Sequence, residues 1–129
     1  AGYAEDGGGT QRMGRYAARR EPVSLHVVWD DLLMAGWASD WQSRSRELAR
    51  GIGVRERRLW SQGDAADWAM ESFRLTETWV YPQVADDVID EVEIESNRPV
   101  VETQLRKAGW RLAWVLNAAL DPGAPGPAP

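Results

Sequence analysis

His26 and Asp30 are the residues of this chain whose types and spacing best fit metal chemistry. They lie in the segment LHVVWDD, where an imidazole precedes a carboxylate by four positions. Residues four apart lie on one face of a helix, with Cβ atoms about 6 Å apart, so both side chains can reach one zinc ion. Zinc takes about four ligands, or about three and a water, and the chain has no second histidine and no cysteine. Further ligands would be carboxylates or a partner's residues; the alternative is an ion pair or a core histidine.

A capped helix is expected to carry this pair. Ser24 precedes an apolar-periodic segment and can accept a hydrogen bond from its first turn, and Gly36 can end the helix. Trp29 lies between the pair in sequence but on another face, which predicts a role in the core. Residues 2–22 contain a glycine triplet and little periodicity, which predicts an irregular loop or short hairpin.

The rest of the chain predicts a mainly α fold. Helices are expected at 40–51, capped by Ser39 or Asp40, at 54–60, and at 64–82, capped by Asp64 and ended by Pro82. A narrow apolar stripe suggests another at 84–95. Pro99 fits the first turn of a last helix, whose apolar residues recur at three and four positions.

Composition restricts the classes of protein that this chain can be. Its 129 residues allow one domain with a modest core, and it has no apolar run long enough to span a membrane. The net charge of −5 argues against a generally basic nucleic-acid binder. Arginines nevertheless cluster at 12–20 and 44–58, where they can meet phosphates or form ion pairs on solvated helix faces. Glu47 and Glu56, within the second cluster, favour the ion pairs.

Four stretches, in order, carry a resemblance to a known family. DGGGT at residues 6–10 is similar to a "DRGGN" loop, and LHVVWDD at 25–31 resembles an "LHxxWD" signature. WAMES at 68–72 with VYP at 80–82, and LRKAGWRLA at 105–113 followed by Leu116-Asn117, resemble two further helix motifs. Together they resemble the zinc-dependent single-strand nucleases of the S1/P1 family. Gly7 and Thr10 replace the basic residue and the asparagine of the loop motif, so this loop offers bases different side chains from those of the family motif.

The resemblance implies a fold, a cofactor and a set of site residues. The fold is a helical bundle of the phospholipase C/single-strand nuclease type, here incomplete, with a cluster of three zinc ions in the family. His26 and Asp30 carry over as ligands of one zinc. Gly8, Gly9 and Thr10 would lie beside the metals and contact a single strand of DNA or RNA.

The resemblance also implies the reaction, which is zinc-dependent endonuclease hydrolysis of single-stranded DNA or RNA to 5′-phosphate products. Most of the family's His and Asp ligands lie upstream of the loop motif. Residues 1–120 are therefore expected to be the carboxy-terminal part of one nuclease domain, inactive without its upstream half, and 121–129 a disordered Pro/Gly-rich tail. The family implies secretion or a periplasmic location. The alternative function is a non-catalytic helical interaction module that retains a vestigial ligand pair.

Overall fold

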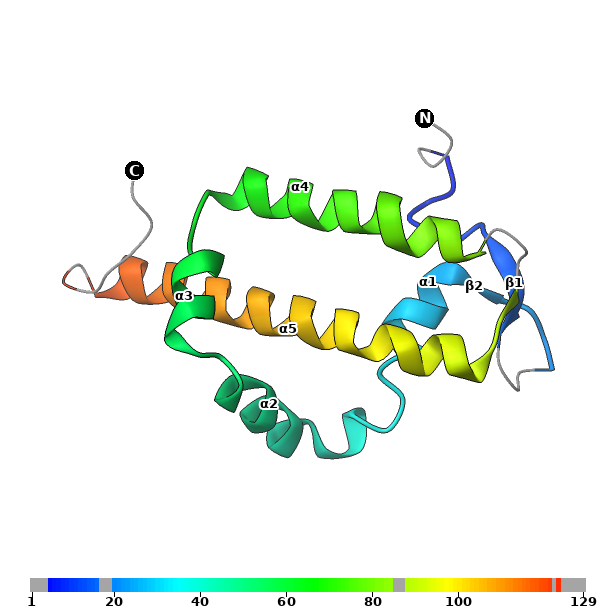
Figure 1. Ribbon diagram of the computed structural model, residues 1–129, viewed down its shortest axis with the longest axis horizontal. Coiled ribbons are helices and arrows are strands. Elements are labelled where there is room, and N and C mark those ends of the chain that lie inside the picture. Colours follow the sequence, from blue (N-terminus) through cyan, green and yellow to red (C-terminus); the bar gives the residue numbers. More distant parts are fainter. Residues whose placement is uncertain (1–4, 17–19, 85–87, 122, 124–129) are drawn as a thin grey trace.

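The computed structural model describes residues 5–16, 20–84, 88–121 and 123, and its architecture is mainly helical (Figure 1). This confirms the fold class expected from the sequence. The α-helices in chain order are α1 (Leu25–Val27), α2 (Trp41–Arg50), α3 (Val54–Trp60), α4 (Ala65–Leu75) and α5 (Glu91–Leu120). The short strands are β1 (Met13–Tyr16), β2 (Val23–Ser24) and β3 (Val88–Ile89), and the other helical turns are η1 (Val28–Leu32), η2 (Ala38–Asp40), η3 (Thr76–Val80) and η4 (Tyr81–Val84).

The long helix α5 is the axis around which the other helices are arranged. In Figure 1, α4 lies along one side of α5 and runs antiparallel to it, whereas α2 lies on the opposite side. The short helix α3 connects α2 to α4. The caps of α2 and α4 are those expected: the Asp40 side chain accepts from Ser43 N, and that of Asp64 accepts from Ala66 N and Asp67 N. Local capping chemistry therefore sets where these helices begin.

Two expectations for the segment before Pro99 are wrong. Residues 84–95 do not form one helix, because β3 lies within that range and pairs in parallel with β1. The last helix begins at Glu91, where Asp90 and Glu93 form a capping box. Pro99 consequently lies more than two turns inside α5 rather than in its first turn, and its missing N–H leaves one helical hydrogen bond unmade. A favourable cap upstream has outweighed the preference of proline for a helix start.

The small sheet and the buried core lie at the amino-terminal end of α5. Strand order is β2-β1-β3, with β1 antiparallel to β2, so a hairpin forms as one of the two expected alternatives, but its second strand lies just beyond the expected range of 2–22. The side chains of the core come from the strands, from the α1 to η1 segment, from η3 and η4, and from the start of α5: Tyr16, Leu25, Val28, Leu33, Val80, Tyr81, Ile89 and Ile94. Trp29 is partly buried against them, as expected.

The expected tail, 121–129, lies outside the described residues except for Asp121, which caps α5, and Gly123. Among the helices that are described, none combines the length and the apolar character needed to cross a membrane.

Candidate metal site and glycine loop

The structure places the predicted metal pair together. His26 Nε2 lies 3.1 Å from Asp30 Oδ2, and the two side chains are 49% and 59% exposed. Zinc bonds of about 2.0–2.2 Å at tetrahedral angles put two ligand atoms roughly 3.3 Å apart. The two donors therefore have nearly the separation that one zinc ion requires, and solvent reaches both. Their chemistry and spacing fit zinc.

The helical segment that carries the pair is shorter and less regular than expected. Ser24 caps it as predicted, its hydroxyl oxygen accepting from Val27 N at 3.3 Å, but the α-helix gives way after three residues to a π-helical turn. Leu33 N donates to Val28 O at 3.0 Å in that turn, and Asp30 lies within it. Arg98 from α5 donates to Leu33 O at 2.9 Å, so the long helix anchors the end of the segment.

The glycine loop lies directly against the backbone of His26. Gly7, Gly8 and Gly9 have φ of 62°, 71° and 87°, a region that side chains other than hydrogen disfavour. His26 N donates to Gly9 O at 3.3 Å, and Gly9 N donates to Asp6 Oδ1 at 3.1 Å. The loop is thus tied at Gly9, whereas a Cβ on Gly8 would meet nothing within 4 Å. This leaves open space beside the exposed Gly8 and Thr10.

Asp6 is held from two sides. Its Oδ2 accepts from the Tyr81 hydroxyl, and its Oδ1 accepts from the loop backbone. The hydrogen bond from Tyr81 is the largest effect on this carboxyl group, and with bonds from Gly8 and Gly9 and the charge of Arg12 it lowers the pKa of Asp6 below its ordinary value. The sequence motifs contained both residues, but their contact depends on the tertiary fold.

Replacement of Gly9 by alanine is expected to displace the loop. The added Cβ would lie 3.3 Å from His26 N and 3.3 Å from Leu25 Cβ, in addition to the cost of a positive φ. We expect a loss of about 2 kcal/mol in unfolding free energy and a shifted amide resonance for His26. Gly8→Ala is the matched control, because it has a similar φ of 71° and open space, and should cost about 1 kcal/mol. Equal effects of the two variants would contradict the close packing at Gly9.

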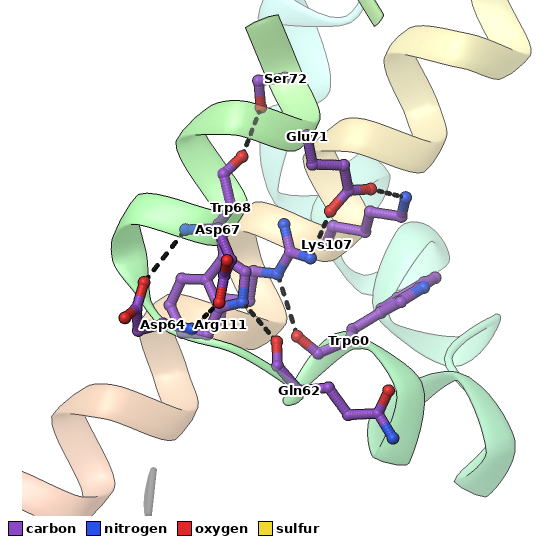
Figure 2. Close-up of polar contacts among 9 residues, drawn as sticks. All are labelled: Trp60, Gln62, Asp64, Asp67, Trp68, Glu71, Ser72, Lys107 and Arg111. Carbon is purple, nitrogen blue, oxygen red and sulfur yellow. Dashed lines mark hydrogen bonds and ion pairs between the residues drawn. The ribbon is translucent and has the colours of Figure 1, made fainter. Parts of the chain in front are cut away.

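A polar cluster away from the glycine loop joins α4 to α5 and consists of Trp68, Glu71, Lys107 and Arg111 (Figure 2). Arg111 Nη2 donates to Glu71 Oε2 at 2.6 Å, and Lys107 Nζ donates to the other carboxylate oxygen. The Arg111 guanidinium also lies 5.0 Å from the centre of the Trp68 ring and donates through Nε to Trp60 O at 3.0 Å. These residues belong to the two helix motifs singled out in the sequence. Their arrangement shows a structural link, which spacing within either motif alone could not reveal.

The Glu71 carboxyl group is ionised in this cluster. Burial raises its pKa, but hydrogen bonds from Lys107 and Arg111 and their positive charges outweigh burial, so the pKa is lowered overall.

The arginine cluster at 44–58 also supplies an ion pair of the expected kind. Arg44 contacts Glu47 at 2.7 Å within α2, and it also contacts Glu102 on α5.

Two apolar grooves flank α5, and Asp30 contributes to the lining of both. The α4–α5 groove has a volume of about 700 Å³ and includes Trp29, Leu105 and Leu112. The α2–α5 groove has a volume of about 760 Å³ and includes Trp37 and Trp110. No group of three or more His, Cys, Asp or Glu side chains suitable for a metal ion occurs within the described ranges. Within these ranges the candidate site is therefore limited to the His26 and Asp30 pair, which lies beside large apolar surfaces.

Fold and site together define a mainly helical protein with a pair of zinc-compatible donors beside a glycine loop. The chain matches the S1/P1 Nuclease family over residues 1–121. It therefore belongs to the S1/P1 nuclease family, which is zinc-dependent and acts on nucleic acid. No curated protein and no solved structure matches the chain.

Proposed function

We propose that this chain supplies part of the active site of a zinc-dependent endonuclease that hydrolyses single-stranded DNA or RNA to 5′-phosphate products. The observation that carries the proposal is the His26 and Asp30 pair, whose donor atoms lie 3.1 Å apart on an exposed face in a chain of this family. A surface ion pair alone would need no particular neighbour. Here the glycine loop is hydrogen-bonded to the backbone of His26 itself.

His26 and Asp30 would hold one zinc ion, the first through a neutral ring nitrogen and the second as a carboxylate. Zinc held there would supply an activated water as nucleophile and would neutralise charge on the phosphodiester. The exposed backbone of Gly8 and the side chain of Thr10 would contact the strand next to the ligand pair. Gly9 keeps that contact surface in place, because its carbonyl accepts from His26 N.

We further propose that the remaining zinc ligands come from a segment that packs into the two apolar grooves. Two donors do not complete a zinc site, and the described residues offer no third. Asp30 contributes to both grooves, so a segment seated there would reach the open side of the pair. Its apolar face would also cover exposed side chains such as Leu112 and Leu116. This is the part that the upstream half of the domain would play, and the family, which is typically secreted, favours a secreted or periplasmic location.

Cleavage of a labelled single-stranded oligonucleotide tests the proposed function. We expect little or no hydrolysis by this chain alone, and zinc-dependent hydrolysis by the longest gene product that contains it. The products should carry 5′-phosphates, a chelator should abolish their formation, and a duplex of the same sequence is the control. Hydrolysis by neither protein would favour the non-catalytic interaction module. Zinc-dependent cleavage by this chain alone would show that its own residues suffice.

A further inference from the structure

Tyr81 and Asp6 form a long-range contact that the proposed chemistry does not use directly. They lie 75 positions apart in the sequence, and the Tyr81 hydroxyl donates to Asp6 Oδ2. Tyr81 is 8% exposed and belongs to the hydrophobic core, whereas Asp6 begins the glycine loop, whose Gly7, Gly8 and Thr10 are exposed. The contact therefore joins the hydrophobic core to the start of a loop that packs closely only at Gly9.

A continuous series of hydrogen bonds runs from this contact to the metal pair. Tyr81 donates to one oxygen of Asp6, Gly9 N donates to the other at 3.1 Å, and His26 N donates to Gly9 O at 3.3 Å. Thr10 Oγ1 adds bonds within the loop, to Gly7 O at 3.0 Å and to Asp6 O at 3.3 Å. Gln11 N also donates to Asp6 O at 3.0 Å, so these polar contacts restrain a loop whose three glycines contribute no side chains.

We propose that Tyr81 is a positioning residue that holds the glycine loop through Asp6 at a fixed place beside His26, and thereby sets the affinity for a single strand. The effect on affinity rests on the proposed function, whereas the effect on the loop does not. Tyr81 acts by keeping the exposed surface at Gly8 and Thr10 next to the ligand pair, so that the loop loses little conformational freedom when a strand binds.

The test compares Tyr81→Phe, which removes only the hydroxyl, with Thr78→Val. Thr78 is the matched control because it lies in the preceding helical turn and its hydroxyl donates to Arg74 O at 2.7 Å, away from the loop. We expect Tyr81→Phe to speed amide hydrogen exchange at Gly9 and His26 at least about tenfold. We also expect it to weaken binding of a phosphorothioate oligo-dT single strand, in the presence of zinc, by about fivefold to tenfold. Thr78→Val should change neither quantity.

A pH titration of Asp6 adds a measurement that would not change if Tyr81 only filled space in the core. The groups that face Asp6 are the Tyr81 hydroxyl, the Gly8 and Gly9 amides and the charge of Arg12. Removal of the hydroxyl removes the largest effect that lowers the pKa of Asp6, so the Gly9 amide resonance should titrate at a higher pH in Tyr81→Phe. A core role would leave this midpoint in place.

The outcomes separate the two proposals. Unchanged amide exchange and an unchanged Gly9 titration in Tyr81→Phe would overturn the positioning role, whatever the chain binds. Faster exchange with unchanged oligonucleotide affinity would overturn the link between loop order and binding. If neither the unsubstituted chain nor the longest gene product that contains it binds the oligonucleotide, the proposed function fails, and exchange and titration still decide whether Tyr81 holds the loop. A folding defect in Tyr81→Phe is met by Asp6→Asn, in which the same loop amides should exchange faster.

Discussion

Glu71→Gln is expected to lower the unfolding free energy at pH 7 by about 2–3 kcal/mol and the thermal midpoint by roughly 10 °C. The amide is nearly isosteric but carries no charge. The side chains of Lys107 and Arg111, 19% and 11% exposed, would lose the carboxylate that accepts from both. Most of the loss in unfolding free energy is expected from Arg111, because its guanidinium is held between Glu71, Trp60 O and the Trp68 ring (Figure 2).

The pH dependence of this loss gives a second measurement. The pKa of Glu71 is lowered in the folded protein, so its contribution is complete above its unfolded value of about 4.5 and disappears as the pH falls through the folded value. The difference between unsubstituted protein and Glu71→Gln should therefore be constant near neutrality and shrink in acid. Chemical denaturation at several pH values measures it.

Glu77→Gln is the matched control, because Glu77 is an exposed carboxylate in the helical turn after α4. Its replacement should change the unfolding free energy by less than about 0.5 kcal/mol. A loss in Glu71→Gln that is no larger than in this control would show that the helices α4 and α5 are held together by apolar packing alone.

The elements that follow from neighbours in sequence are those that the sequence predicted. Ser24, Asp40 and Asp64 cap helices because a short polar side chain bonds to amides two or three residues away. Asp90 and Glu93 form a capping box, a local signal that marks the start of α5 in the sequence itself. Strand β3 has no such signal, since two residues become a strand only by pairing with β1.

In the candidate site, too, local contacts were predictable and long-range contacts were not. The spacing of His26 and Asp30 predicted that they share one helix face, and the structure places their donor atoms together. The π-helical turn that contains Asp30 was not predicted, and the contact at its end, where Arg98 from α5 donates to Leu33 O, is long-range in sequence. The contacts of Tyr81 with Asp6 and of Glu71 with Arg111 join residues far apart in sequence. The motifs contained all four residues, but only the fold shows which motif meets which.

His26→Ala is expected to weaken binding of zinc to the strongest site of this chain at least about 100-fold. Loss of a residue that only orients a ligand costs about 10–100-fold in metal affinity, and here the ligand itself is removed, so a single carboxylate is left. Competition with a chromophoric chelator measures the affinity, and elemental mass spectrometry after dialysis against a weak chelator gives the zinc retained per chain. Because ligands must be deprotonated, affinity in the unsubstituted chain should also fall in acid.

The control for this variant is Asp31→Asn, which removes a neighbouring exposed carboxylate without touching the pair. Asp30→Asn should reproduce the loss, whereas Asp31→Asn should retain the affinity. The side chain of His26 is 49% exposed, so His26→Ala should keep the circular dichroism and the thermal midpoint of the unsubstituted chain. Equal zinc affinity in His26→Ala and in the unsubstituted chain would show that the metal binds elsewhere. The pair would then be an ion pair on a helix surface, and the case for a nuclease active site built on these two residues would fail with it.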